Sequence, residues 1–336
     1  MRCIYLIIIL CAAALIGCTP SSLLQPNAQP ANKQQTDQQT DQQTDQKQAD
    51  QQSTDQQQAA VQSTGAQQSP DLQSPDLQST QSNYTTLIWS DEFEKNELDI
   101  EKWYPMTGTG PSEGYPENWG NNEKQYYRAE NALVRSGCLS ILIKREEYEG
   151  MEYTSARLTT SGLYAFTYGR VEARIKLPGG EDGLWPAFWL LPDGEPNDWK
   201  YGTWAASGEI DVMEYRSRLP GEISGAAHFG GRWPANTSES GSFVFPGGDS
   251  ATDWHIYAME FTPDKMNWYV DGKEFFEITD WFTIVNDRLY GNPKPFDQPF
   301  CILLNGAVGG NFDGGREPGA NFTEAEILVD WVRVYQ

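Results

Sequence analysis

Hydrophobic and polar positions alternate along much of the chain beyond residue 84, with the two-residue period of β-strands. The clearest alternating runs are Leu139–Lys144, Gly169–Lys176, Glu209–Tyr215, Trp254–Phe261, Met266–Val270 and Ile327–Tyr335. Because alternate side chains of a strand point to opposite faces, each run predicts a strand with one buried face. The chain has no long run with the 3.6-residue period of an amphipathic helix.

Short segments rich in Gly and Pro separate these runs and predict turns. Asp271-Gly272, between Met266–Val270 and Lys273–Ile278, is the signal of a tight β-hairpin. All twelve Trp residues lie between Trp89 and Trp331. These features predict that residues 84–336 form one all-β domain, most simply a sandwich of two sheets.

The first 83 residues differ from this domain. Residues 1–18 contain one Arg, a short apolar run and small residues before Cys18, which indicates a secretory signal. Leu15-Ile16-Gly17-Cys18 resembles a bacterial lipobox, so we expect a lipid on Cys18, although an ordinary signal peptide with an incidental cysteine is the alternative. Residues 19–83 are mostly Gln, Asp, Thr and Ser, a composition that predicts a disordered tether. The expected location is extracytoplasmic and lipid-anchored, on the outer membrane if the cell has one.

Charge and cysteine content exclude some partners. A formal net charge of −23 disfavours nucleic acid as a partner. Two His residues, far apart in the chain, offer no spacing for a zinc site. Only Cys138 and Cys301 lie beyond the predicted leader and lipobox. Each is adjacent to an apolar residue at the start of a predicted strand, and we expect two reduced thiols rather than a disulfide.

The segment Trp204–Tyr215 carries the candidate chemistry, because it places Glu209, Asp211 and Glu214 among apolar residues. Strict alternation would put Glu209 and Asp211 on one face but Glu214 on the other. A β-bulge at Val212–Met213 would bring all three acids to the same face, and such bulges are frequent beside active sites. The alternative is an exposed edge strand whose acids are merely solvated.

Neighbouring carboxylates disfavour joint ionisation, so at least one of these pKa values should be raised. One ionised and one protonated carboxyl group are what a retaining glycosidase requires. The ionised group attacks the anomeric carbon, and the protonated group donates to the leaving oxygen.

The acidic stretch resembles the active-site strand of glycoside hydrolase family 16, laminarinase branch, whose pattern is E-[IL]-D-x-x-E. The resemblance extends over nearly the whole region from residue 89 to 336. It is carried by W-S-D-E-F (Trp89–Phe93), N-N-E-K-Q-Y-Y (Asn121–Tyr127), Y-T-S-A-R-L (Tyr153–Leu158), Y-G-R-V-E-A-R-I-K-L-P (Tyr168–Pro178), G-L-W-P-A-F-W-L-L (Gly183–Leu191), W-Y-V-D-G (Trp268–Gly272), P-F-D-Q-P-F (Pro295–Phe300), N-G-A-V-G-G-N (Asn305–Asn311) and V-D-W-V-R-V-Y-Q (Val329–Gln336). Ala205 and Lys124 depart from the family pattern.

The resemblance implies a β-jelly roll with a concave substrate-binding sheet. It assigns Glu209 as the nucleophile, Asp211 as its supporting acid and Glu214 as the general acid/base. It also implies that six residues contact the sugar: Trp204, Trp185, His228, Asn121, Arg157 and Asn305. The alternative for each is a structural role, as a core, turn or hydrogen-bonding residue.

Family members often hold a structural calcium ion far from the cleft. In this chain its ligands would be Asp330, Glu92 and Gly137, whereas the alternative for Asp330 is a salt bridge to Arg333 or another base. No organic cofactor is expected for catalysis.

The implied activity is retaining endo-hydrolysis of β-1,3-linked, laminarin-type glucan by a monomer. The sequence leaves three alternatives open: a mixed-linkage β-glucanase, a galactan hydrolase of the same family, and a non-catalytic glycan-binding lipoprotein. Non-catalytic relatives usually lose the acids, and both Glu residues are present here.

Overall fold

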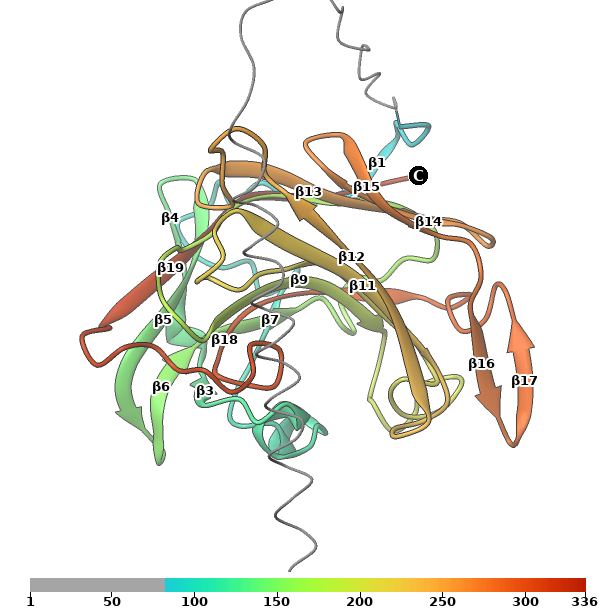
Figure 1. Ribbon diagram of the computed structural model, residues 1–336, viewed down its shortest axis with the longest axis horizontal. Helices are drawn as coiled ribbons and strands as arrows, with labels where there is room; N and C mark the ends of the chain where they lie inside the picture. The colour runs from blue at the N-terminus through green and yellow to red at the C-terminus, as the bar shows by residue number, and fades with distance from the viewer. Residues whose placement is uncertain (1–81) are drawn as a thin grey trace, which may run out of the picture. The chain divides into compact units, whose positions relative to one another are not determined.

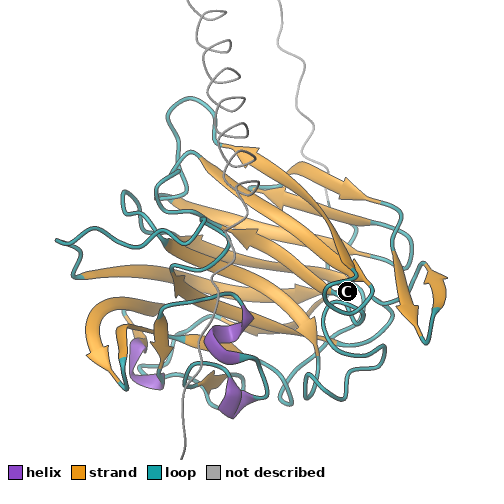
Figure 2. Cartoon of the chain, turned by 60° about the horizontal axis from the view of Figure 1, so that its bottom comes forward, coloured by secondary structure: helices purple, strands orange, loops and turns teal. Residues whose placement is uncertain are grey.

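The computed structural model describes residues 82–336 as two large β-sheets that pack face to face (Figure 1; Figure 2). The predicted signal peptide, the lipidation site Cys18 and the predicted tether up to residue 81 lie outside the described residues. In residues 82–336, no helix has the length and apolar character needed to cross a membrane.

The first sheet has ten strands, and β8 and β19 lie at its centre. Its ordered path is β15 (Lys273–Ile278), β14 (Met266–Val270), β13 (Trp254–Phe261), β8 (Gly169–Lys176), β19 (Glu324–Tyr335), β5 (Cys138–Tyr148), β6 (Met151–Ser155) and β3 (Gln125–Tyr127). In addition, β1 (Leu87–Asp91) pairs with β19, and β4 (Ala132–Arg135) pairs with β5.

The second sheet has nine strands and carries the candidate chemistry on β10. Its path is β17 (Arg288–Gly291), β16 (Phe282–Val285), β11 (Glu222–Gly230), β10 (Glu209–Glu214), β9 (Leu184–Pro192), β18 (Phe300–Val308), β7 (Arg157–Thr159) and β2 (Tyr104–Met106), while β12 (Asn236–Val244) pairs with β11. Three short 3₁₀ helices, η1 (Pro111–Glu113), η2 (Glu117–Gly120) and η3 (Ala129–Asn131), lie in the connections (Figure 2).

The predicted two-sheet β-jelly-roll sandwich is confirmed. Each predicted strand is present. Leu139–Lys144 lies within the longer β5, Ile327–Tyr335 is the end of the longer β19, and β10 ends at Glu214, one residue before the predicted end at Tyr215. The Asp271-Gly272 turn joins β14 to β15 as expected, in antiparallel register.

Alternation explains how the sheets enclose a core. Ile141 and Ile143 of β5, Val171 of β8, and Phe188 and Ile210 of the second sheet are fully buried and belong to one hydrophobic cluster. Burial of so much apolar surface stabilises the fold at roughly 25 cal/mol per Å² removed from water. The opposite face of the second sheet is left free for the polar side chains of the site.

Both cysteines of the domain are free thiols, as predicted. Cys138 lies on β5 in the first sheet and Cys301 on β18 in the second. Cys301 is buried, and burial raises the pKa of its thiol to about 11. It is therefore a packing residue rather than a reactive one.

Candidate active site

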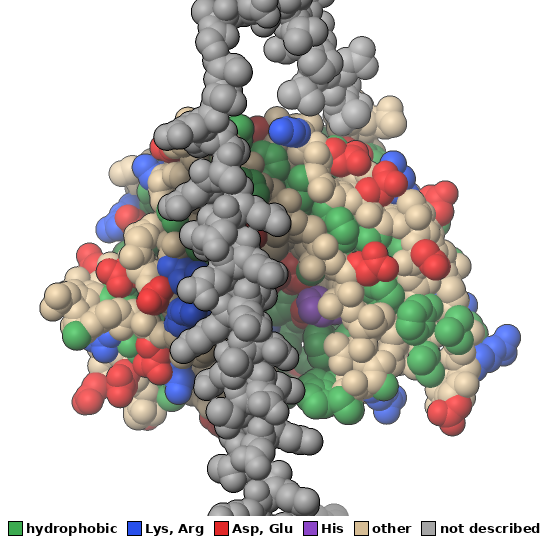
Figure 3. Space-filling model, in the orientation of Figure 1, with side chains coloured by type: hydrophobic (Ala, Val, Ile, Leu, Met, Phe, Trp, Pro, Cys, Tyr) green, Lys and Arg blue, Asp and Glu red, His purple; other side chains and the backbone are tan. Residues whose placement is uncertain are grey.

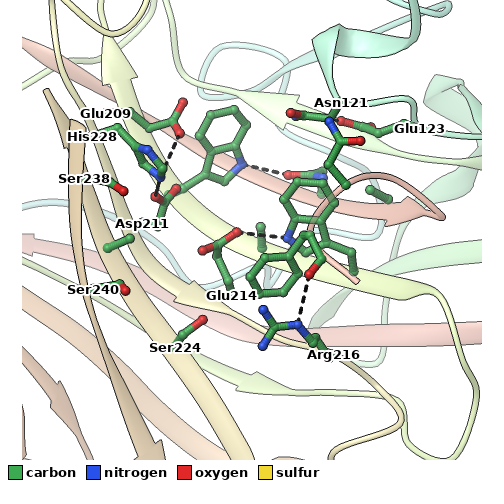
Figure 4. A pocket seen from close by; sticks show the side chains of 18 of the residues that line it. Asn121, Glu123, Glu209, Asp211, Glu214, Arg216, Ser224, His228, Ser238 and Ser240 are labelled. Atoms are coloured by element: carbon green, nitrogen blue, oxygen red, sulfur yellow. Dashed lines mark hydrogen bonds and ion pairs between the residues drawn. The ribbon is translucent and has the colours of Figure 1, made fainter. Parts of the chain in front are cut away.

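Strand β10 contains the predicted β-bulge. Asp211 pairs with Ala226 of β11, whereas Glu214 pairs with Ser224, so one extra residue lies on β10. The side chains of Val212 and Met213 are both buried in the core. The bulge therefore brings Glu214 back to the face of Glu209 and Asp211, and all three acids line one cavity of about 450 Å³ (Figure 4).

The register of the sheet aligns each acid with side chains from neighbouring strands. Glu214 pairs with Ala187 of β9, which pairs with Asn305 of β18, which pairs with Arg157 of β7. Four strands thus contribute one residue each to the same row across the cleft. This register explains how residues from distant motifs meet at one site.

All nine residues predicted to act in catalysis or to contact the sugar line this cavity. The space-filling view shows a hollow in which acidic, His and apolar side chains lie together (Figure 3). The roles of the six predicted substrate-binding residues remain predictions, but their positions around the three acids are as the resemblance implies.

Each glutamate accepts a hydrogen bond from an indole. Trp204 Nε1 donates to Glu209 Oε2 over 3.1 Å, and Trp185 Nε1 donates to Glu214 Oε1 over 3.1 Å. These bonds fix the orientation of both carboxyl groups, while the indole rings remain part of the cleft wall.

His228 of β11 lies opposite the first two acids. Its Nε2 is 3.3 Å from Asp211 Oδ2 and 3.8 Å from Glu209 Oε1. The contact with Asp211 is an ion-pair distance without the alignment of a hydrogen bond, because Asp211 Oδ2 has no hydrogen-bond partner among the described residues. Burial lowers the pKa of His228, but the adjacent Asp211 carboxylate and the charges of Glu209 and Glu214 outweigh burial and raise the pKa to about 9.

The pKa values of both glutamates are raised, and burial is the largest cause in each case. Burial and the charge of Asp211 raise the pKa of Glu209 to about 8, while His228 and the Trp204 indole oppose the rise. Burial, together with Asp211, raises the pKa of Glu214 well above its ordinary value. The expected rise of at least one pKa is confirmed for both groups, since burial adds to charge repulsion. A raised pKa suits the proton donor, because Glu214 must carry its proton when the glycosidic bond breaks.

Arg157 forms part of the wall on the β7 side of the cleft. It is only 3% exposed, and its guanidinium lies between the rings of Tyr115, Trp119 and Trp189, with 4.4–4.9 Å from the guanidinium carbon to each centroid. Its Nε and Nη2 have no hydrogen-bond partner among the described residues. A buried guanidinium with unused donors at a cavity wall favours a ligand that supplies acceptor oxygens.

The sequence interpretation missed Glu123, which lines the same wall. Glu123 is 2% exposed and accepts hydrogen bonds from Gln125 Nε2 (2.7 Å) and Tyr127 OH (3.1 Å). Tyr127 OH also accepts from Asn305 Nδ2 (2.9 Å), and Asn305 Oδ1 accepts from Trp189 Nε1 (2.7 Å). This network holds Trp189 against Arg157. Its only sequence signal was an acid between Asn121 and Tyr127 in a family motif.

Two further parts of the cleft lining were also missed. Phe312 stacks on Trp185 with 5.0 Å between ring centroids, and the guanidinium of Arg216 covers Phe312 at 3.9 Å. Four serines of β11 and β12 also line the cavity: Ser224, Ser238, Ser240 and Ser242. No local sequence pattern distinguishes these serines from those of an ordinary exposed strand.

Asp330 and Glu92, two of the three predicted calcium ligands, lie outside the lining of the cleft and are paired with arginine side chains. Gly137, the third, precedes β5. Asp330 Oδ2 is 2.6 Å from Arg174 Nη1, and both oxygens of Glu92 are bonded to Arg333, at 2.8 and 3.0 Å. The alternative of a salt bridge for Asp330 therefore describes this structure, with Arg174 as the base. Carboxylates already neutralised by guanidinium groups do not fit a calcium site, so calcium binding stays a prediction.

Within the described part of the chain, one group of three His, Cys, Asp or Glu donors lies close enough to hold a metal ion, namely Glu209, Asp211 and His228. A protonated imidazole has no free lone pair and cannot ligate a metal. The raised pKa of His228 therefore favours a charge-pairing role over a metal site.

A jelly roll that presents a buried pair of glutamates with raised pKa values in an aromatic-lined cleft is typical of a glycoside hydrolase. The family model described as "Glycosyl hydrolases family 16" matches residues 118–332. The chain belongs to this family. A second model, described as "Beta-glucan synthesis-associated protein SKN1/KRE6/Sbg1", matches residues 2–202 and ends before β10.

Curated relatives and solved structures agree with this assignment. The chain is 45% identical over 269 residues to "Glucan endo-1,3-beta-glucosidase A1" of Niallia circulans, a match that covers 74% of this chain and 38% of that protein. It is also 41% identical over 262 residues to "Beta-glucanase" of Rhodothermus marinus, and this match covers 74% of this chain and 85% of that protein. The X-ray structure of the laminarinase from Rhodothermus marinus superposes with a TM-score of 0.63 at 39% identity, over 75% of this chain and 97% of that one.

Proposed function

We propose that this protein is a retaining endo-β-glucanase that hydrolyses β-1,3-glucosidic bonds of laminarin-type glucan. The names of the Niallia and Rhodothermus relatives support this substrate. The observation that carries the chemistry is the placement of Glu209 and Glu214 on one bulged strand, each held by an indole N–H.

In the first step, the carboxylate of Glu209 attacks the anomeric carbon. The bond from that carbon to the glycosidic oxygen breaks, and the proton of Glu214 passes to the departing oxygen. The product is a covalent glycosyl-enzyme and a free chain end. Donation by a positioned acid of this kind contributes about 10²–10⁴-fold to the rate.

In the second step, Glu214 is a carboxylate and takes a proton from water. The water oxygen bonds to the anomeric carbon as the bond to Glu209 breaks, which restores both glutamates to their starting protonation states. The two inversions leave the anomeric configuration unchanged. No organic cofactor is required.

His228 and Asp211 tune the pKa values of both glutamates in opposite directions. The charge of protonated His228 lowers the pKa values of both glutamates, and its Nε2 lies 3.8 Å from Glu209. Asp211 raises both pKa values by its negative charge, which helps Glu214 to hold its proton.

The test is a substrate panel with purified residues 82–336. Laminarin should be cut into oligosaccharides, with lichenan, xyloglucan, agarose and carrageenan cut much more slowly or left intact. Faster cleavage of lichenan would favour mixed-linkage specificity, and cleavage of agarose or carrageenan would favour a galactan hydrolase. Binding of laminarin without cleavage would indicate a glycan-binding protein and overturn the proposal.

We further propose that the domain is a monomer displayed outside the cytoplasm by a lipid on Cys18. The support is the sequence alone: the lipobox-like residues 15–18 and the polar segment 19–83. Several acyl chains on one residue would anchor it stably, because each buried CH₂ contributes about 0.8 kcal/mol.

A further inference from the structure

A second cavity, of about 120 Å³, opens on the same sheet as the active site. Its polar lining comes from β2, β7, η1 and three connecting segments: Tyr104, Glu113, Tyr115, Thr159, Ser161 and Glu195. None of the catalytic or predicted sugar-contacting residues belongs to this lining.

The strand register connects this cavity to the acids. Tyr104 pairs with Thr159, which pairs with Leu303 of β18, and Leu303 pairs with Trp189, which pairs with Asp211. The second cavity therefore lies in the same row across the sheet as Asp211. Thr159 is three strands away from β10, which corresponds to roughly 14 Å at the usual strand spacing.

One contact links the walls of the two cavities. Arg157 lines the active-site cleft, Tyr115 lines the second cavity, and the guanidinium carbon lies 4.9 Å from the centroid of the Tyr115 ring. A glucan chain that leaves the acids along the Arg157 side of the sheet would reach the second cavity after several pyranose units.

The lining suits a neutral sugar. The ring of Tyr104 is 48% exposed and offers a flat apolar face, the kind of surface on which a pyranose stacks. Glu113 Oε1 accepts from Tyr104 OH (3.3 Å) and Thr107 N (3.0 Å), which fixes the carboxylate beside the ring. The second oxygen of Glu113 and both oxygens of Glu195 accept no hydrogen bond from the described residues, so they are free to accept from hydroxyl groups.

The charge of the cavity narrows the ligand class. Its lining contains Glu113 and Glu195 but no Lys, Arg or His. These carboxylates add to the desolvation that raises the pKa of Tyr104. An anionic ligand would be repelled, whereas a neutral ligand rich in O–H donors is matched by the carboxylates and by Thr159 and Ser161.

We propose that the second cavity is a distal subsite that binds a glucosyl unit of the same glucan chain whose scissile bond lies at Glu209 and Glu214. This inference rests on the proposed function, because it takes the ligand to be that enzyme's substrate. It predicts that cleavage efficiency rises with chain length until the substrate is long enough to reach Tyr104.

The experiment measures kcat/KM for wild type, Tyr104→Ala and Glu195→Gln on a series of β-1,3-linked glucose oligosaccharides of increasing length. Both side chains are exposed at the cavity mouth, so folding should persist. Tyr148→Ala is the matched control, because Tyr148 is also a partly exposed aromatic residue but lines neither cavity.

We expect Tyr104→Ala to lower kcat/KM on the longest oligosaccharides by about three- to tenfold, the effect of losing one aromatic contact. Glu195→Gln should give a smaller loss in the same direction. On the shortest oligosaccharide that is cleaved, kcat/KM of both variants should equal that of wild type. The kcat/KM of Tyr148→Ala should equal that of wild type at every oligosaccharide length.

Equal kcat/KM for wild type and Tyr104→Ala at every length would overturn the subsite, as would a loss of equal size at every length. Failure of wild type to cleave any member of the series would contradict the β-1,3 specificity instead. In that case the same variants would be compared on oligosaccharides of whichever glucan in the substrate panel is cleaved.

Discussion

His228 and Glu209 face each other across strands β11 and β10, and His228 Nε2 lies 3.8 Å from Glu209 Oε1. The acids raise the pKa of His228 to about 9 even though burial lowers it. A cation therefore lies beside the nucleophile at neutral pH and opposes the rise of its pKa, which burial and Asp211 nevertheless bring to about 8.

Replacement of His228 by Gln should shift the pH dependence of catalysis. The histidine charge lowers the pKa of Glu209, so its loss should raise that pKa further above about 8. The acidic limb of the kcat/KM profile reports ionisation of Glu209 and should move to higher pH, and the basic limb should follow because His228 also lowers the pKa of Glu214. An unchanged acidic limb in a folded variant would show that His228 does not tune the nucleophile.

Glu209→Gln should lose activity but gain stability. Activity should fall by at least about 10²-fold because the nucleophile is removed. The folded-state pKa of Glu209 is raised from 4.5 to about 8. The protonated carboxyl group therefore makes its full contribution to the free energy of unfolding below pH 4.5, and this contribution is lost as pH rises through 8. The melting temperature of the variant should therefore exceed that of wild type by an amount that grows across this pH range.

The matched control for this comparison is Glu239→Gln, an exposed acid on β12. Its melting temperature and activity should follow those of wild type at each pH. A melting temperature of Glu209→Gln below that of wild type at pH 8 would contradict this prediction. It would show that the ionised carboxylate of Glu209 does not destabilise the folded protein.

Anchoring is tested by metabolic labelling with a radioactive fatty acid. The wild-type chain should incorporate label and remain with membranes, whereas Cys18→Ser should do neither. Label retained by Cys18→Ser, or wild type found free in the medium, would exclude lipidation at Cys18.

Calcium removal tests the remaining metal prediction. Because guanidinium groups already neutralise Asp330 and Glu92, EDTA should leave the melting temperature of wild type unchanged. A fall in melting temperature that Asp330→Asn abolishes would instead show calcium at this site. Activity at temperatures well below unfolding should not change, because the site lies away from the acids. No effect of EDTA on melting would favour the ion pair between Asp330 and Arg174 over calcium.

The sequence predicted what depends on local periodicity. Alternation located the strands, and the need to put three acids on one face predicted the bulge after Asp211. Features that depend on the register between distant strands could not be predicted from the sequence. Asp330 meets Arg174 because a register shift between Val329 and Trp331 places β19 against β8 in that way.

The second cavity also could not be predicted from local sequence patterns. Tyr104, Glu113 and Glu195 come from three separate segments, and none has a neighbour in sequence that marks it as a binding residue. Burial of Glu123 and the rise of both glutamate pKa values likewise depend on the walls that distant loops form around them.

A double displacement through Glu209 and Glu214 is tested most directly by the anomer that is released first. Proton NMR during the earliest phase of laminarin hydrolysis, before mutarotation, separates the two outcomes. Attack by Glu209 followed by attack of water should release new reducing ends in the β configuration, that of the substrate. New reducing ends that appear first in the α configuration would contradict the account.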